Sequence, residues 1–512
     1  MDFVAHVQQG YTFKGDSFVL GVGIHEGKTH PEAQVKVPLK TLNRHGLIAG
    51  ATGTGKTKTL QLLAECLSNH SIPVLMMDIK GDLSGIAQAG QSNAKIQERI
   101  ATMQMTYQPT AYPVELLTLT EQPGVRLRAT VTEFGPVLLS KILGLNDTQG
   151  GLVSLIFKFC DDQGFPLLDL KDFIKVLQYI SQDGKAAIEK EYGKISTTST
   201  GTILRKVIEL QQQGADVFFG EPSFEVEDLM QIAPDGRGMI HVLRVTDMQD
   251  KPKLFSTFML QLLAELYASC PEEGDLDQPK LILFIDEAHL VFQEASDALM
   301  QQLESVIKLI RSKGIGIFFC TQNPQDVPAS ILSQLGFKVQ HALRAFTAAD
   351  RKTIKQAAEN FPLTDFYKTD ELLTQMGIGE AFITLLNEKG IPTPLVHTML
   401  LPPRSRMDIL TDNEINDLMK RSRLAVKYNK SIDNTSAYEM LEQKIQQRLE
   451  MNDEEKNDQP PPKSTTTSTG GFFDHPVVKQ VGRTAAAVLT RSLLGALGLA
   501  GTRRASTSRR RR

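Results

Sequence analysis

The residues with the clearest chemical pattern lie between Gly50 and Thr57, where the chain reads GATGTGKT. This matches G-x-x-x-x-G-K-[ST], a loop whose glycines let backbone N–H groups turn inward around a phosphate. The apolar run GLIAG precedes the loop and the helical pattern TKTLQLLAECLS follows it, which is the setting that the motif requires. We therefore expect ATP phosphates to bind at Gly50, Ala51, Thr52, Gly53, Thr54, Gly55, Lys56, Thr57 and Lys58.

A second pattern is the acidic pair Asp286 and Glu287, which follows the apolar run 281–285. A carboxylate at the end of a buried strand can hold Mg²⁺ or a magnesium-bound water, so Asp286 and the Thr57 hydroxyl are the expected metal ligands. Glu287 is placed to polarise the attacking water as a general base. The pair could instead begin a helix as an N-cap, but a fully apolar strand before it favours the metal site.

Three further polar residues could act on the transferred phosphoryl group. Gln322 ends the apolar pattern GIGIFFCTQ, where its amide could contact the terminal phosphate or the lytic water, or could cap the loop before Pro324. Arg311 and Arg344 could stabilise developing negative charge, and Arg311 at a subunit edge would act on a neighbour's nucleotide in a ring. Arginines near helix ends are also common because of the helix dipole, so both roles stay open.

Strand and helix patterns alternate around these motifs, and this predicts a doubly wound α/β core with a parallel-rich sheet. Strands are expected at 46–50, 73–81, 238–245, 280–288, 314–322 and 337–346, and helices at 57–68, 253–270 and 295–313. A terminal hairpin is expected within 378–402, and a helix at 435–450.

The composition of the chain shifts along its length, and this predicts seven segments. They are a short N-terminal β segment at 1–45, the first part of the core at 46–136, a helical insertion at 137–232, the second part of the core at 233–402, C-terminal helices at 403–450, a disordered linker at 451–471 and a basic amphipathic tail at 472–512.

The bulk composition excludes several classes of protein. A chain of 512 residues with 41% hydrophobic and 22% charged residues is neither wholly disordered nor fibrous. It has no apolar stretch of spanning length and no signal-peptide pattern, so we expect no transmembrane segment and a cytoplasmic location. The four cysteines are Cys66, Cys160, Cys270 and Cys320. They are far apart in the sequence, which argues against a zinc ribbon, a redox pair or a disulfide framework.

The net charge of -3 is unevenly distributed. Residues 471–512 contain nine lysines and arginines but only one acid, Asp474, so the rest of the chain is acidic. Three uses of this basic, partly apolar tail remain open: contact with an acidic membrane surface, neutralisation of DNA phosphates, or a solvated or self-associating appendage.

Taken together, the motifs NRHGLIAGATGTGKTKTLQ, VLMMDIKGDLSGIAQAG, LILFIDEAHLVF, LIRSKGIGIFFCTQNPQDVP and QHALRAFTAAD resemble, in order and spacing, the HerA-like P-loop ATPase family of the HerA/FtsK clan. The resemblance implies a RecA-like core, ATP and Mg²⁺ as ligands, a hexameric ring and translocation of double-stranded DNA. It also implies roles for individual residues: Lys56 and Thr57 as the Walker A pair, Asp286 and Glu287 as the Walker B pair, Gln322 as sensor, Arg311 as trans-acting finger and Arg44 as a second nucleotide-contacting arginine.

Three functions compete on these observations. The first is an ATP-driven translocase or helicase on double-stranded DNA. A P-loop kinase is disfavoured by Glu287 and Gln322, which favour hydrolysis by water. The third is a remodelling or regulatory ATPase whose partner is a protein or a membrane, with the helical insertion 137–232 as its docking surface.

Overall fold

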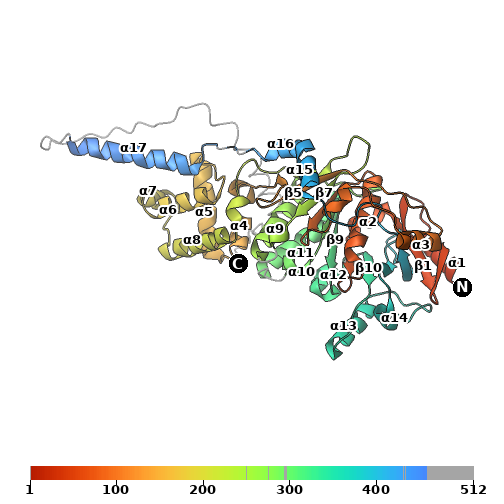
Figure 1. The fold of residues 1–512 in the computed structure, drawn as a ribbon. Coiled ribbons are helices and arrows are strands. Elements are labelled where there is room, and N and C mark those ends of the chain that lie inside the picture. Colours follow the sequence, from red (N-terminus) through yellow and green to blue (C-terminus); the bar gives the residue numbers. More distant parts are fainter. Residues whose placement is uncertain are drawn as a thin grey trace, which may run out of the picture. The chain divides into compact units, whose positions relative to one another are not determined.

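The computed structural model describes residues 2–248, 251–274, 276–292, 297–430, 432 and 434–457 (Figure 1). Their contacts divide into two compact units. Of the described residues, the first contains those within 2–127 and 224–430, and the second contains 128–223, 432 and 434–457. The basic tail predicted at 472–512 lies outside the described residues.

The first unit is built on one sheet, to which the described residues contribute twelve strands in the order β2-β1-β12-β11-β10-β3-β9-β8-β4-β7-β5-β6. All neighbouring pairs from β10 to β6 are parallel, and those from β2 to β10 are antiparallel. The predicted parallel-rich sheet and terminal hairpin are therefore confirmed. The strands are β1 Ser17–His25, β2 Lys28–Pro38, β3 Gly46–Ala49, β4 Val74–Asp78, β5 Val114–Thr118, β6 Val125–Arg126, β7 Ile240–Arg244, β8 Leu281–Ile285, β9 Ile315–Thr321, β10 Phe337–His341, β11 Glu380–Thr384 and β12 Val396–Leu400.

The central strands are buried on both faces, as a parallel sheet covered by helices requires. Every residue of β3, β4, β8 and β9 is buried. On one face Val74, Ile282 and Phe284 belong to the same apolar cluster as leucines of α2. On the other face Phe319 of β9 packs against Phe292 of α10, with ring centroids 5.7 Å apart.

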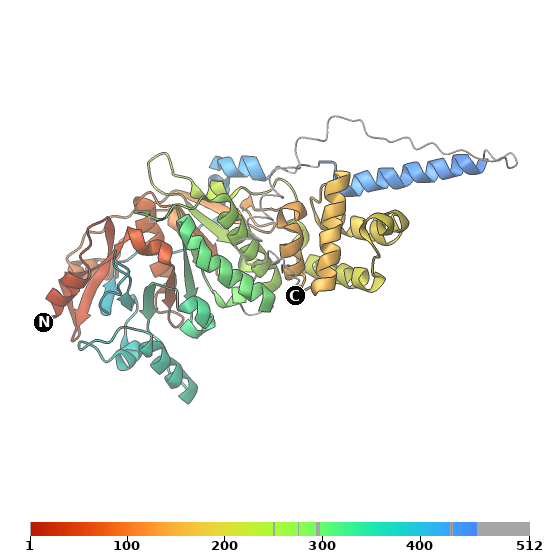
Figure 2. The same cartoon turned by 180° about the vertical axis from the view of Figure 1, so that it is seen from behind.

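Helices of the first unit follow the strands in the expected alternation. Their bounds are α1 Phe3–Gly10, α2 Lys56–Asn69, α3 Ala94–Met103, α9 Pro252–Ser269, α10 His289–Phe292, α11 Asp297–Ile310, α12 Ala329–Leu332, α13 Ala348–Glu359, α14 Thr369–Gln375, α15 Asp412–Arg421 and α16 Arg423–Tyr428. Helices α9 and α11 lie side by side (Figure 2), and so do α13 and α14.

Two segments differ from the expected strand pattern. Strand β2 ends at Pro38, and a 3₁₀ turn, Leu39–Arg44, leads into β3. The strand expected at 337–346 stops at His341, because the carbonyl of Ala342 accepts the backbone N–H of Ala51 at 2.8 Å and the chain then leaves the sheet. The segment 1–45 also begins with a helix, α1, before its two strands.

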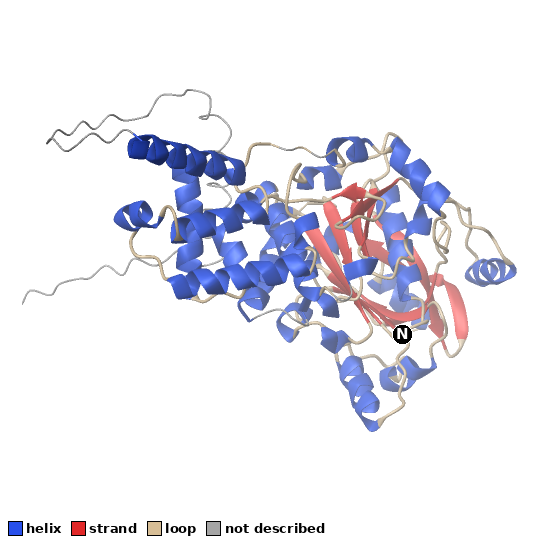
Figure 3. Cartoon of the chain, turned by 60° about the vertical axis from the view of Figure 1, so that its left-hand side comes forward, coloured by secondary structure: helices blue, strands red, loops and turns tan. Residues whose placement is uncertain are grey.

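The second unit is helical, whereas the strands gather in the first unit (Figure 3). Its helices are α4 Val131–Ile142, α5 Asp147–Gln163, α6 Leu170–Ser181, α7 Lys185–Tyr192, α8 Thr197–Gln212 and α17 Ala437–Asn457. The insertion thus spans Arg128–Ser223, not 137–232.

Helix α17 separates from the other C-terminal helices and joins the second unit. It packs on α6, and Asp172 Oδ1 accepts the backbone N–H of Tyr438 at 2.9 Å. Because α17 continues to Asn457, the first residues of the linker expected at 451–471 are helical, and the rest lie outside the described residues.

Candidate active site

The phosphate loop joins the end of β3 to the start of α2, and its glycines have backbone angles that other residues rarely adopt. Gly50 has φ +153° and Gly55 has φ +112°. A Cβ at Gly50 would lie 2.5 Å from Cβ of His341, and one at Gly55 would lie 3.2 Å from the backbone nitrogen of Gly379. These two positions therefore require glycine for both strain and space.

Residues from β10 and β11 brace the loop from one side. The backbone N–H of Gly379 donates to the Thr54 carbonyl at 3.0 Å. The ring of His341 is buried and lies between Glu380 O and Thr59 Oγ1, at 2.9 Å from each. Since a carbonyl only accepts, Nδ1 carries the proton and Nε2 accepts from Thr59. Burial lowers the pKa of His341 to about 4, so the ring is neutral and holds this arrangement at neutral pH.

Lys56 is folded back onto its own loop. Its Nζ donates to the carbonyl oxygens of Gly50 at 2.7 Å and Ala51 at 3.2 Å. Burial lowers the pKa of this ammonium, and the charge of Lys80 acts in the same direction. An anionic phosphate would relieve both effects, because it restores a charged partner to a desolvated cation.

Asp286 lies directly beyond β8, two strands away from the phosphate loop, with β9 between. Its side chain is buried, and burial raises the pKa of the carboxyl group. Its Oδ2 has no hydrogen-bond partner among the residues that the structure describes. A buried carboxylate oxygen without a partner, together with the half-buried Thr57 hydroxyl at the start of α2, fits the oxygen ligands that Mg²⁺ prefers.

Glu287 is also buried and has φ +46°, a left-handed backbone conformation that costs free energy outside glycine. Its Oε1 forms an ion pair with Nζ of Lys80, and its Oε2 lies 3.3 Å from Nδ1 of His289. Strand β8 ends at Ile285, and the chain turns at Glu287 through its left-handed conformation. Asp286 and Glu287 therefore do not alternate between the two faces of a strand.

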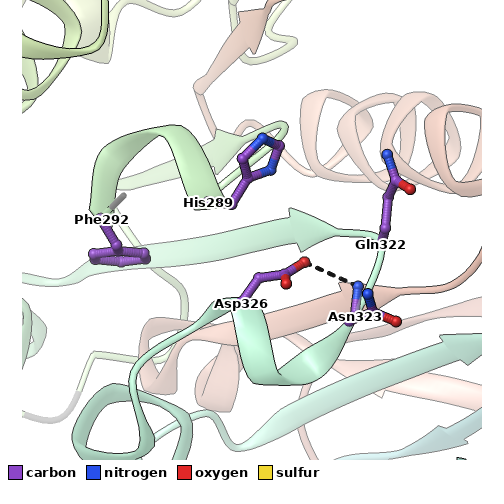
Figure 4. A pocket seen from close by; sticks show the side chains of 5 residues that line it. All are labelled: His289, Phe292, Gln322, Asn323 and Asp326. Atoms are coloured by element: carbon purple, nitrogen blue, oxygen red, sulfur yellow. Dashed lines mark hydrogen bonds between the residues drawn. The ribbon is translucent and has the colours of Figure 1, made fainter. Parts of the chain in front are cut away.

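Gln322 follows β9 and is exposed beside a pocket of about 550 Å³. In Figure 4 the side chains of Gln322 and His289 project to the same side, whereas Asp326 lies lower and accepts the backbone N–H of Asn323 at 3.0 Å. Because β9 lies between β3 and β8, the end of β9 that carries Gln322 stands between the phosphate loop and the acidic pair. Its contact with phosphate or water stays a prediction.

The three arginines do not gather at one end of the sheet. Arg344 is exposed in the loop three residues beyond β10, on the same edge as the phosphate loop. Arg44 precedes β3 and Arg311 precedes β9, so both lie at the opposite edge. His45, next to Arg44, lies with its Nε2 2.8 Å from the carbonyl oxygen of Ile307, four residues before Arg311, so the two segments are neighbours there. Within one chain, neither Arg44 nor Arg311 is brought to the phosphate loop.

Three lysine and histidine side chains change the site that the sequence predicted. The side chain of Lys58 donates to the carbonyl of Met407 at 2.6 Å, so its ammonium is directed away from the loop. Lys80 and His289, in contrast, contact the acid expected to be the base, although no role in the site was expected for either. The sequence signal for Lys80 was its position in the motif VLMMDIKGDLSGIAQAG, just after the apolar run that ends at Asp78.

A glycine-rich loop between a parallel strand and a helix, with an acidic pair at the same edge of the sheet, defines a P-loop nucleotide-binding protein of the RecA-like class. A family model described as "Helicase HerA-like C-terminal" matches residues 24–504. The chain belongs to this family.

Two curated relatives give the same picture. The DNA double-strand break repair helicase HerA of Sulfolobus acidocaldarius is 21% identical over 372 residues, which cover 70% of this chain and 66% of the relative. The helicase of the same name from Saccharolobus solfataricus is 22% identical over 355 residues, covering 68% and 63%. This chain thus spans less than two thirds of either relative.

Solved structures share the fold. The bacterial conjugative coupling protein TrwB, in a form with sulphate, has a TM-score of 0.53 at 14% identity and covers 80% of this chain and 95% of its own. TrwB with a non-hydrolysable ATP analogue has a TM-score of 0.50 at 14% identity, with 78% and 99% covered. The likeness confirms the predicted RecA-like core.

The described residues carry three further findings. None of their helices is both long and apolar enough to span a membrane. Among them there is no group of three or more His, Cys, Asp or Glu side chains arranged to hold a metal ion. All four cysteines lie in this part of the chain and are free thiols.

Proposed function

We propose that this chain is a Mg²⁺-dependent ATPase that works as a motor on double-stranded DNA. The observation that carries the proposal is the placement of Lys56, Asp286, Glu287 and Gln322 at the ends of three adjacent parallel strands, β3, β9 and β8. Open parallel sheets bind ligands at this edge.

The roles of the residues follow from their positions. The loop amides and Lys56 bind the phosphates, while Asp286 and Thr57 hold Mg²⁺, which neutralises charge on the phosphate oxygens when bound. Glu287 accepts a proton from the attacking water. At the same time the oxygen of this water bonds to the terminal phosphorus, and the bond from that phosphorus to the ADP oxygen breaks. Gln322 positions this water or the phosphate. The exposed Arg344 lies on this edge as well and could contact the nucleotide.

The two arginines at the opposite edge support assembly into a ring. Strand β9 has seven residues, which at ~3.3 Å each separate its two ends by about 23 Å. An arginine side chain cannot cross that distance to its own phosphate loop. Arg311, and Arg44 at the same end of the sheet, would therefore act on the nucleotide of a neighbouring copy, as in a hexamer.

DNA as the substrate rests on the curated relatives, which are DNA repair helicases. A second candidate is a remodelling ATPase that acts on a protein or a membrane. The observation in its favour is the helical unit, which has its own packed aromatic residues, such as Phe157 and Phe173 with ring centroids 6.3 Å apart, and could dock a protein partner. A cytoplasmic location remains a prediction.

One experiment separates these functions. ATP hydrolysis by the purified chain is measured with and without double-stranded DNA, over a series of protein concentrations, with Glu287→Gln as the control. We expect a rate that DNA increases and that rises cooperatively with concentration. If the rate of hydrolysis depends on Glu287 but is the same with and without DNA, the chain is not a DNA motor. The protein or membrane partner of the second candidate function would then be sought at the helical unit.

A further inference from the structure

Lys80 lies in the motif VLMMDIKGDLSGIAQAG, but neither its side chain nor its position had a role in the expected nucleotide site. Strand β4 lies beside β8, with Met77 opposite Ile285, so the chain that leaves β4 emerges next to the acidic pair. The turn is rigid, because the carboxylate of Asp78 accepts backbone N–H groups from Gly81 at 2.7 Å and Leu83 at 3.1 Å. Lys80 is thus presented to Glu287 by an ordered turn.

Both carboxylate oxygens of Glu287 have a nitrogen against them. The ammonium of Lys80 is paired with Oε1, and Nδ1 of His289 lies 3.3 Å from Oε2. The Glu287 side chain is 7% exposed and that of Lys80 is 35% exposed, so the pair is closed to solvent on the glutamate side and open on the lysine side. A general base must offer one of these oxygens to the attacking water.

We propose that Lys80 is a positioning residue that holds Glu287 in an ion pair while no nucleotide is bound, so that ATP hydrolysis requires this pair to open. This inference rests on the proposed role of Glu287 as general base. It makes Lys80 the group that links occupancy of the phosphate site to activation of the water.

The charges around the pair supply a physical trigger. Burial disfavours the charge on Lys80, but the contact with Glu287 and the negative charges of Asp286 and Glu287 together outweigh burial, and the pKa of Lys80 is raised. The same ammonium lowers the pKa of Lys56, so the two lysines share one electrostatic environment. A polyphosphate on the loop adds negative charge there and competes with Glu287 for Lys80.

The test compares Lys80→Met, which removes the charge but keeps a similar stem, with Lys80→Arg, which keeps the charge. We expect the DNA-free turnover of Lys80→Met to rise about three- to fivefold, the factor expected for releasing a partly exposed ion pair. Its KM for ATP should stay within about twofold of wild type, and its stimulation by DNA should shrink. Lys80→Arg should behave as wild type.

A matched control is Lys368→Met, because Lys368 pairs with Glu371 at 3.2 Å far along the chain on an exposed helix. Unchanged turnover in Lys80→Met would overturn the proposal. A fall in turnover with a raised KM would also overturn it, since Lys80 would then bind phosphate directly.

A second measurement does not depend on activity. In the nucleotide-free protein, the loss of Tm in the double variant Lys80→Met with Glu287→Gln should be smaller than the sum of the two single losses. Additive losses would contradict the ion pair. If Glu287→Gln hydrolyses ATP normally, the proposed role of Glu287 as general base fails whatever Lys80 does. If Glu287→Gln is inactive but Lys80→Met is no faster, only the Lys80 proposal fails.

Discussion

At the scale of single residues, the site contains charged groups that are paired within the protein and one carboxylate oxygen that has no partner among the described residues. Lys56 rests on the carbonyls of its own loop, and Glu287 rests on Lys80. Asp286 keeps one buried oxygen without a partner among the described residues. In the proposed function, Lys56 and Asp286 would gain the phosphates and Mg²⁺ as partners, which is the behaviour expected of a site prepared for its ligand.

Replacement of Lys56 by alanine should abolish tight binding of ATP. A charge-assisted hydrogen bond is worth roughly 1.5 to 3 kcal/mol, so affinity should fall about ten- to hundredfold. Titration with a fluorescent ATP analogue measures this. Lys95→Ala, at an exposed lysine of α3, is the control, and wild-type affinity in Lys56→Ala would contradict the assignment.

Glu287→Gln should bind ATP with an affinity within about threefold of wild type but lose turnover, because the amide cannot accept the water proton. General-base catalysis contributes about 10²- to 10⁴-fold, so we expect at least a hundredfold loss. Parallel binding and phosphate-release assays separate the two effects. Normal hydrolysis by this variant would show that another group is the base.

At the scale of elements, the histidine before β3 connects three of them. His45 Nε2 donates to the carbonyl of Ile307 in α11 at 2.8 Å, and its Nδ1 accepts the backbone N–H of Ile317 in β9 at 3.0 Å. The second bond requires the neutral ring, because a protonated Nδ1 cannot accept a hydrogen bond. Burial lowers the pKa of His45 to about 4, and the charge of Arg311 acts in the same direction.

This predicts a pH dependence of stability. Below pH 6.5 His45 becomes protonated in the unfolded chain but stays neutral in the folded protein. The contribution of neutral His45 to the free energy of unfolding is therefore full above pH 6.5 and is lost as pH falls toward 4. Between pH 7.5 and pH 5 the loss is about 2 kcal/mol.

Urea unfolding of wild type and His45→Gln at both pH values tests the assignment of this pH dependence. The variant should be the less stable at pH 7.5, and the gap between the two proteins should narrow at pH 5. A gap independent of pH would show that His45 does not carry the effect.

At the scale of the whole molecule, the opposite placement of the arginines and the phosphate loop predicts active sites shared between copies. Arg311→Ala should lose hydrolysis at concentrations where wild type assembles, while retaining ATP binding. Lys56→Ala should also be inactive.

Mixing the two inactive variants should restore part of the activity, because some interfaces then pair an intact loop with an intact arginine. Hydrolysis measured against mixing ratio tests this. Full activity of Arg311→Ala in an assembled ring would show that Arg311 is not the trans-acting arginine. Activity of a chain that does not assemble would show that hydrolysis does not require a ring.

Local patterns were sufficient to locate most of the site. The strand, glycine loop and helix around Lys56, and the apolar strand before Asp286 and Glu287, are contiguous in the chain, so hydrophobic periodicity and residue spacing reveal them. Gln322 was located in the same way, as the residue after an apolar strand. The parallel sheet followed from the alternation of these elements.

Tertiary structure decided which strand ends become neighbours. A parallel sheet pairs strands that are distant in sequence, so no local pattern shows that β4 lies against β8 and brings Lys80 to Glu287. The same reason explains why the bracing of the loop by His341 and Gly379, and the return of α17 to the helical unit, were not foreseen. Sequence determined the chemical groups of this site, and the order of strands determined which of them meet.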